Sequence, residues 1–204
     1  MNTTSQNVIH YPELALLVFL LPDTAMAYDF MVDGIYYDKN GNTATVTYQY
    51  YDNYNEQSYS DYSGDLTIPS NVTYEGITYP VTSIGEYAFS YCSDITSVSI
   101  PNSVTSIGDM AFSGCSGLTY ITIPNHVVYI GKSAFFNCSG LTGVSISNSV
   151  TSIDNSVFGL CSELTNVTIP NSVTTIGDEA FRGCLRLTNF SIPNSVITPV
   201  RDNV

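Results

Sequence analysis

Apolar positions between Val81 and Ile192 repeat with a fixed period of 23 residues, and polar residues fill most positions between them. Five apolar columns follow this period, and each repeat supplies one member to each column. The columns are Ile84, Ile107, Ile130, Ile153 and Ile176; Phe89, Phe112, Phe135, Phe158 and Phe181; Cys92, Cys115, Cys138, Cys161 and Cys184; Ile95, Leu118, Leu141, Leu164 and Leu187; and Ile100, Ile123, Ile146, Ile169 and Ile192. A fixed period of this length is typical of a solenoid, in which each repeat forms one coil and neighbouring coils bury the core between them.

Within one repeat the pattern predicts two extended pieces and one helical turn. Apolar and polar residues alternate in Leu118–Pro124, which predicts a short strand that ends at the proline. A second extended piece follows at 127–130. In Ala111–Cys115 the apolar residues are spaced i, i+1 and i+4, as on one face of a short helix. The predicted fold class is α/β, a solenoid of 23-residue coils with a parallel β-sheet face and short helical turns opposite it.

A column of small residues precedes each predicted helical turn. Its members are Gly85, Gly108, Gly131, Asp154 and Gly177. Glycine adopts positive φ readily, and aspartate tolerates it better than most residues. We therefore predict a positive-φ corner between the second extended piece and the helical turn of every coil.

The chain is expected to have three parts. These are a secretory signal peptide (1–27), a small antiparallel β cap (28–80) and the solenoid (81–204), with five full repeats and a partial one. Leu14–Leu21 is an apolar run too short to span a bilayer, and Ala25-Met26-Ala27 offers a small-x-small cleavage site.

The predicted cap contains 11 of the 16 tyrosines. Strand-like runs separated by turn signals predict a meander and a hairpin that turns at Glu75-Gly76. The polar segment Asp52–Asp61 is predicted to be a loop. A solenoid end exposes its core, so we expect this part to cover the first coil.

Charge excludes some partners. The chain has 18 acidic and 5 basic residues, a net charge of −13. Phosphate affinity depends on Lys and Arg, so nucleic acid and anionic membrane surfaces are not expected partners. No transmembrane anchor is predicted.

The five cysteines raise the question of catalysis or metal binding. A nucleophilic thiol needs a base beside it, and the chain has only His10 and His126. A zinc site needs converging ligands at short spacing, whereas these cysteines recur once per coil. The preferred interpretation is a column of buried free thiols, with disulfides between adjacent coils as the alternative. No enzyme activity, metal or cofactor is expected.

The segment LTNVTIPNSVTTIGDEAFRGC, from Leu164 to Cys184, carries a family resemblance. It resembles the BspA-like leucine-rich repeats of bacterial surface and secreted proteins almost letter for letter. The resemblance covers roughly residues 81–196. It implies a leucine-rich-repeat solenoid, a secreted or cell-surface location and adhesion to host or microbial macromolecules.

The sequence leaves two functions open. One is a non-enzymatic interaction or adhesion module that binds a protein or glycan, from host matrix or other microbes, through the strand face. The other is a structural spacer, or the N-terminal fragment of a larger surface repeat protein. The proposed binding face consists of Ser97, Tyr120, Asn166, Asn189, Thr122 and Thr168, with Gly143 beside Tyr120. The sequence does not name the ligand, the mode of attachment or the oligomeric state.

Overall fold

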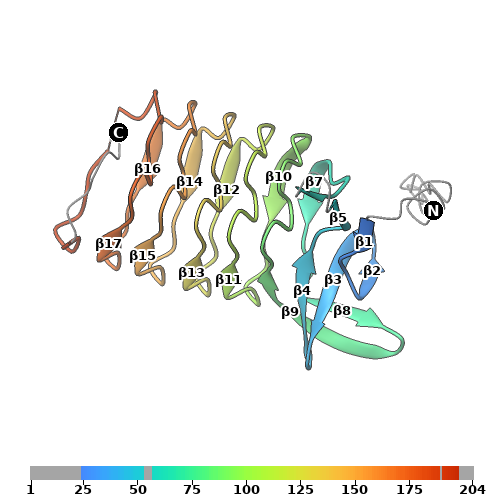
Figure 1. The fold of residues 1–204 in the computed structure, drawn as a ribbon. Coiled ribbons are helices and arrows are strands. Elements are labelled where there is room, and N and C mark those ends of the chain that lie inside the picture. The colour runs from blue at the N-terminus through green and yellow to red at the C-terminus, as the bar shows by residue number, and fades with distance from the viewer. Residues whose placement is uncertain (1–23, 53–56, 189, 198–204) are drawn as a thin grey trace, which may run out of the picture.

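The computed structural model describes residues 24–52, 57–188 and 190–197, which form an elongated stack of coils with a strand-rich segment at its N-terminal end (Figure 1). The strands of that segment are β1 (Thr24–Met26), β2 (Phe30–Val32), β3 (Ile35–Asn40), β4 (Thr43–Thr47), β5 (Tyr50–Asp52), β6 (Gln57–Tyr59), β7 (Gly64–Thr67), β8 (Asn71–Tyr74) and β9 (Ile77–Ile84). The coils contain β10 (Ile95–Ser99), β11 (Ser106–Ile107), β12 (Tyr120–Thr122), β13 (Tyr129–Ile130), β14 (Gly143–Ser145), β15 (Ser152–Ile153), β16 (Asn166–Thr168) and β17 (Thr175–Ile176).

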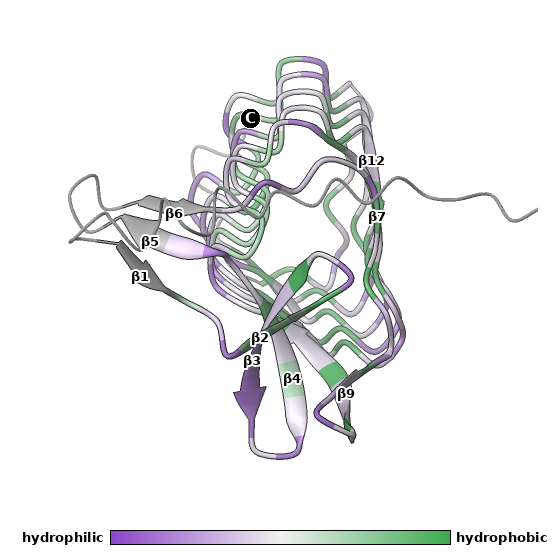
Figure 2. Cartoon of the chain, turned by 90° about the vertical axis from the view of Figure 1, so that its right-hand side faces the viewer, coloured by the Kyte–Doolittle hydropathy of each residue, from purple (hydrophilic) through white to green (hydrophobic). Residues whose placement is uncertain are grey.

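Parallel strands on two sides of the stack join successive coils. On one side β12, β14 and β16 form a sheet in which Tyr120 pairs with Gly143 and Gly143 with Asn166, a step of 23 residues each time. On the other side β9, β11 and β13 pair in turn, and β15 pairs with β17. Seen along the axis, the coils superpose around a common interior (Figure 2). The periodicity therefore predicted the solenoid correctly.

The predicted helical turns are wrong. The described residues contain no helix, so this part of the chain is built from strands and turns and is not α/β. In the second coil the Ser113 N–H donates to Met110 O at 3.1 Å and the Cys115 N–H to Phe112 O at 3.2 Å, which are tight turns of the i→i−3 kind. Between them, the Phe112 N–H donates to Ala134 of the next coil at 2.7 Å. Along this segment, N–H groups that close turns alternate with N–H groups that donate to the next coil. In an α-helix the backbone N–H groups bond within the helix and would not be available to the next coil.

Left-handed residues enforce this arrangement, and they do not lie where the sequence predicted them. None of the glycines in the column of Gly108 and Gly131 has a positive φ. Within the coils, the described positive-φ residues lie in two other columns, which are Tyr87, Met110, Ser133, Ser156 and Glu179, and Tyr91, Gly114, Asn137, Leu160 and Gly183. Two left-handed residues in each turn segment end any helix before it completes a second turn.

Close contact between coils explains the glycine column instead. A Cβ on Gly131 would lie 2.5 Å from the backbone nitrogen of Asp109 and 2.6 Å from the carbonyl carbon of Gly108. The Asp109 side chain also lies over Gly131, where its Oδ1 accepts the Lys132 N–H at 2.9 Å. Only glycine allows the coils to approach this closely.

Asp154 occupies the same column, and the strand pairing is interrupted there. No ladder joins β13 to β15 among the described strands. In other coils the N–H at this position donates to a side chain one coil earlier, as Lys132 N does to Asp109 Oδ1 and Asp178 N to Asn155 Oδ1. For the Asn155 N–H the residue one coil earlier is Lys132, whose side chain has no acceptor. Asp154 replaces it, since its own Oδ1 accepts that N–H at 2.7 Å. The carboxylate of Asp154 thus satisfies an N–H at the one position of this column where a side chain replaces glycine and the ladder is missing.

The core is a stack of phenylalanine rings with a column of thiols beside it. Ring centroids from Phe89 to Phe181 are 4.9, 5.2, 5.5 and 5.5 Å apart, and the planes are nearly parallel. Tyr62 and Phe190 pack against the two ends at steep angles of 60°. All five rings of the phenylalanine stack are fully buried.

The N-terminal segment continues the solenoid's parallel pairing. β4 pairs with β9, and β7 pairs with β10, both in parallel. β2, β3 and β4 form the expected antiparallel meander, and β8 and β9 form the expected hairpin. The segment predicted to be a loop contains β6, which pairs with β5, and β5 also pairs with β1. Residues 1–23, which include most of the expected signal peptide, lie outside the described residues.

Candidate functional site

The candidate binding face is the outer side of β10, β12, β14 and β16, which we call the strand face. Short strands form here because each repeat alternates an inward Ile or Val with outward Ser, Thr or Asn. The register places Tyr120 beside Gly143 and Gly143 beside Asn166, and likewise Thr122 beside Ser145 and Ser145 beside Thr168. Asn189, the last expected member of this face, lies outside the described residues.

Ser97 has a different environment from the other predicted residues. β10 pairs with β7, and no ladder joins it to β12 among the described strands. The Ser97 hydroxyl donates to Asp65 Oδ1 at 2.6 Å, and Thr96 donates to the same oxygen at 2.7 Å. These two bonds lower the pKa of Asp65, so its carboxylate stays ionised. Sequence reasoning missed Asp65, because it lies 32 residues before Ser97 and outside the repeats.

Tyr120 is the prominent aromatic residue of the strand face. Its side chain is 52% exposed, which leaves much of the ring accessible. One edge of the ring lies over Gly143, since a Cβ there would be 3.1 Å from two ring carbons. Because Gly143 has no side chain, the edge of the Tyr120 ring can lie against its backbone.

Two shallow hollows adjoin Tyr120. The first, about 700 Å³, extends from β10 across β12 to Ser145. The second, about 670 Å³, extends from Tyr120 across β14 to Thr168. The two hollows share the lining residues Tyr120, Ser145 and Asn148. Together the two hollows therefore form one continuous strip along the solenoid axis.

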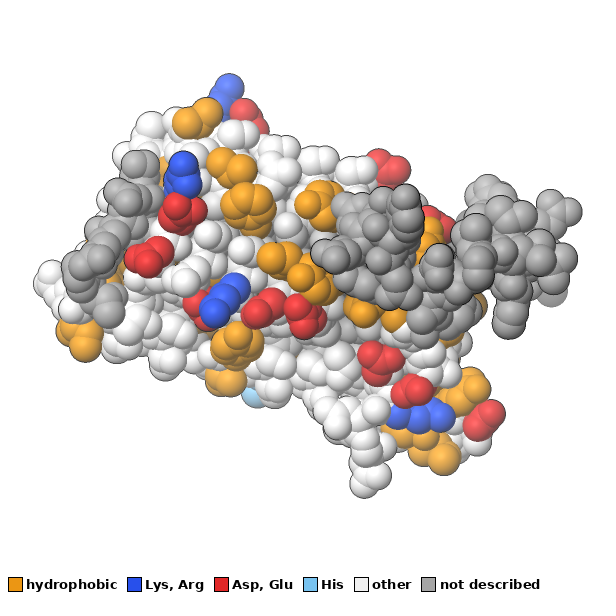
Figure 3. All heavy atoms as spheres, viewed as in Figure 1, with side chains coloured by type: hydrophobic (Ala, Val, Ile, Leu, Met, Phe, Trp, Pro, Cys, Tyr) orange, Lys and Arg blue, Asp and Glu red, His pale blue; other side chains and the backbone are white. Residues whose placement is uncertain are grey.

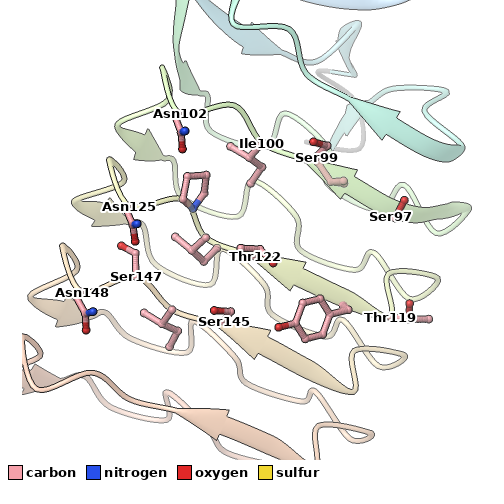
Figure 4. A pocket seen from close by; sticks show the side chains of 15 residues that line it. Ser97, Ser99, Ile100, Asn102, Thr119, Thr122, Asn125, Ser145, Ser147 and Asn148 are labelled. Atoms are coloured by element: carbon pink, nitrogen blue, oxygen red, sulfur yellow. The ribbon is translucent and has the colours of Figure 1, made fainter.

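Two rows of polar side chains run along this strip. Figure 4 shows Ser99, Thr122 and Ser145 following one another from coil to coil, with Asn102, Asn125 and Asn148 in a second row. The hydroxyls of Thr122, Ser145 and Thr168 and the amides of the asparagine row have no hydrogen-bond partner among the described residues. In contrast, Thr142 and Thr165 donate to the carbonyl one coil earlier, at 2.9 and 3.0 Å.

Neither hollow is lined by an ionisable side chain apart from the phenol of Tyr120. Charged residues of the coils lie in the turn segments, where Glu179 and Arg182 form an exposed ion pair at 2.7 Å. Figure 3 shows a face on which acidic, basic and exposed apolar side chains lie together. The strand face is by comparison an uncharged polar surface.

The cysteines do not form a catalytic or metal site. All five are buried and free, as the preferred interpretation predicted. Each thiol donates to a backbone carbonyl, and four of these carbonyls belong to phenylalanines of the preceding coil, as with Cys138 and Phe112 O at 3.1 Å. Burial raises the pKa of Cys184 to about 11 and that of Cys92 to about 12, so neither forms a thiolate nucleophile near neutral pH. Across the described part of the chain no group of His, Cys, Asp or Glu could hold a metal ion.

This fold and this surface define a parallel β-solenoid of the leucine-rich-repeat class. The model of the BspA type leucine rich repeat region matches residues 82–203 in 6 copies, and the chain belongs to this family. No curated protein matches the sequence. Where the structure describes the chain, no helix is long and apolar enough to cross a membrane.

Solved structures of bacterial proteins share the fold. A leucine-rich repeat protein from Eubacterium ventriosum is 28% identical with a TM-score of 0.52, covering 78% of this chain and 46% of its own. The pneumococcal vaccine antigen PcpA is 24% identical with a TM-score of 0.50, covering 76% of this chain and 47% of its own. A leucine rich cell surface protein from Faecalibacterium prausnitzii is 28% identical with a TM-score of 0.47, covering 78% of this chain. This chain spans 53% of that protein's length and 60% of a similar protein from Bacteroides ovatus.

Proposed function

We propose that the protein is a non-enzymatic interaction module of an exported or cell-surface protein, and that it binds a macromolecule through the strand face. The observation that carries this proposal is the strip around Tyr120. An exposed ring stands between two hollows, and in their lining the hydroxyls of Thr122, Ser145 and Thr168 and the amides of the asparagine row have no partner within the described structure. Exposed aromatic residues beside such hollows are frequent anchors of interfaces.

The other parts of the chain fit the same proposal. The N-terminal segment would act as the cap, because β4 and β7 cover the strands of the first coil and Tyr62 covers the phenylalanine stack at 4.8 Å from Phe89. Residues 1–27 would direct export and be removed after Ala27. This cleavage would also remove β1 from its pairing with β5.

A structural spacer is the second candidate. The near-identical Ser and Thr residues at the outward positions of successive coils favour it, because a spacer needs no individual side chain. Under this hypothesis the polar rows keep the surface hydrated, and Tyr120 has no special role.

A binding screen separates the two candidates. Extracellular-matrix proteins and glycans are immobilised and tested with the wild type, then with Tyr120→Ser. Tyr129→Ser is the matched control, because Tyr129 is similarly exposed at 44% but lies on the opposite strand column. We expect Tyr120→Ser to reduce binding at least tenfold and Tyr129→Ser to leave it unchanged. A hit that is indifferent to Tyr120→Ser would reject the strand face and make the tyrosines at 48–62 the next candidates.

A further inference from the structure

We infer that the ligand of the strand face is an extended, uncharged oligosaccharide that lies along the solenoid axis. This inference rests on the proposed function and adds the chemical class of the ligand. It follows from the spacing of the polar rows, the apolar surface between them, the charge of the strip and the state of the strand edges.

The polar rows repeat at the distance between coils. Paired parallel strands lie about 4.8 Å apart, so Thr122, Ser145 and Thr168 offer one hydroxyl at each step of that length. The asparagine row offers one amide, both donor and acceptor, at the same step. A chain of similar sugar units, with hydroxyls repeating along its length, matches two such rows better than a globular protein surface does.

The floor of the strip between the rows is apolar. Ile100, Ile123 and Ile146 separate the hydroxyl row from the asparagine row, and Ile123 and Ile146 are almost fully buried beneath it. The ring of Tyr120 stands beside this floor. A sugar ring has the same mixed character, with C–H groups on its faces that pack on an aromatic ring and hydroxyls around its edge that hydrogen-bond.

Charge selects against other ligands. The strip has no acidic or basic side chain in its lining, and the carboxylate of Asp65, which lies at its β10 end, is ionised. The net charge of −13 also repels polyanions such as sulfated or uronic-acid glycans. An acidic peptide would find no basic side chain in this lining, and a basic peptide would find only Asp65, whose Oδ1 already accepts from Thr96 and Ser97.

The strand edges argue against an extended peptide as well. Peptides that bind sheets usually add as a strand to an unpaired edge. β14 pairs on both of its edges, and β12 and β16 each have one edge paired with β14, so no free edge runs between these strands and a peptide strand could add only outside this sheet. The side chains that project outward are what a ligand can contact, and these are hydroxyls, amides and one phenol.

Titration calorimetry with purified oligosaccharides tests the inference. The probes are neutral cello-, xylo-, manno- and malto-oligosaccharides, and oligogalacturonate as the charged counterpart. We expect at least one neutral probe to bind with a Kd between about 1 μM and 1 mM. Its affinity should be the same at low and high salt, because no ion pair is involved.

Variants assign the binding to the strip. Tyr120→Ser and Thr122→Val should each weaken binding, the first by about tenfold or more. Tyr120→Phe keeps the ring and should retain most of the affinity, and Tyr129→Ser should bind as the wild type does. Urea midpoints near that of the wild type would show that the variants are folded.

The inference is overturned if no neutral probe binds, if only oligogalacturonate binds, or if neutral binding survives Tyr120→Ser. The proposed function fails separately. A protein ligand that depends on Tyr120, with no neutral oligosaccharide bound, would keep the strand face as the site and reject only the sugar. Ligands of every kind that are indifferent to Tyr120→Ser would reject both.

Discussion

Replacing Gly131 with alanine tests whether the glycine column exists for close approach or for backbone angle. The added Cβ would be placed 2.5 Å from the Asp109 nitrogen and 2.6 Å from the Gly108 carbonyl carbon, and both are backbone atoms. Backbone cannot rotate away as a side chain can. The coils must separate locally, or the residue must shift within a buried site.

The cost follows from the bonds at this contact. Separation stretches the bonds from Gly131 N to Ile107 O and from Lys132 N to Asp109 Oδ1, both 2.9 Å long. Each is worth about 0.5–1.5 kcal/mol, and the one to the carboxylate somewhat more. Alanine recovers about 0.4–1 kcal/mol by restricting the unfolded chain, since the φ here suits any residue. We therefore expect Gly131→Ala to lower the free energy of unfolding by about 2 kcal/mol.

Asp154→Ala is the matched control, since that position already carries a Cβ and its ladder is already interrupted. It loses only the bond from Asn155 N, and we expect a cost below about 1 kcal/mol. Urea unfolding followed by far-UV circular dichroism measures both variants. Equal losses, or a stabilised Gly131→Ala protein, would refute the close-approach explanation.

Three further predictions follow from the core and the N-terminus. Phe135→Ala removes a buried ring between two stacked neighbours and should lower the free energy of unfolding by about 3–5 kcal/mol. Its control Lys132→Ala changes an exposed side chain and should lower it by less than about 0.5 kcal/mol. Similar urea midpoints for the two variants would contradict the phenylalanine stack. Burial raises the pKa of all five thiols in the folded chain. Because the unfolded chain therefore loses thiol protons above about pH 8.5 that the folded chain keeps, the urea midpoint measured in reductant should fall between about pH 7 and pH 9.5. A constant or rising midpoint would count against this. Exported protein should begin at Tyr28 by N-terminal sequencing, and an intact Met1 on exported material would reject the signal peptide.

The repeat columns predicted the core because burial demands the same residue type at the same place in every coil. Phe135 and Cys138 lie in the interior as expected, and so do their equivalents. The helical turn was wrong because the spacing of Ala111, Phe112 and Cys115 fits a helix face and a series of tight turns equally well. The second positive-φ column, with Gly114 and Gly183 in it, was the sequence signal that could have separated the two.

The glycine column misled for a related reason. A glycine that recurs in successive repeats indicates a missing Cβ, and sequence does not say whether the cause is φ or a neighbouring coil. The partner of Gly131 is Asp109, which lies one coil away and is visible only after the chain is folded. Tyr120, Gly143 and Asn166 follow one another in register, as the 23-residue period predicts, and their role in binding stays a prediction. The engagement of Ser97 by Asp65 could not be predicted, because Asp65 belongs to no repeat.

The buried thiols also determine whether unfolding can be reversed. In the folded chain each thiol is inaccessible and bonded to a carbonyl, so oxidants cannot reach it. Once a coil opens, its thiol returns to an ordinary pKa, and an oxidant can convert it to a sulfenic acid, which condenses with another exposed thiol to a disulfide with loss of water. In an oxidising environment this oxidation would trap an opened coil before it could close again. The lifetime of the folded solenoid would then depend on how slowly the coils open. The solenoid's lifetime in an oxidising environment is thus a kinetic property, set by the stacking that keeps the coils closed.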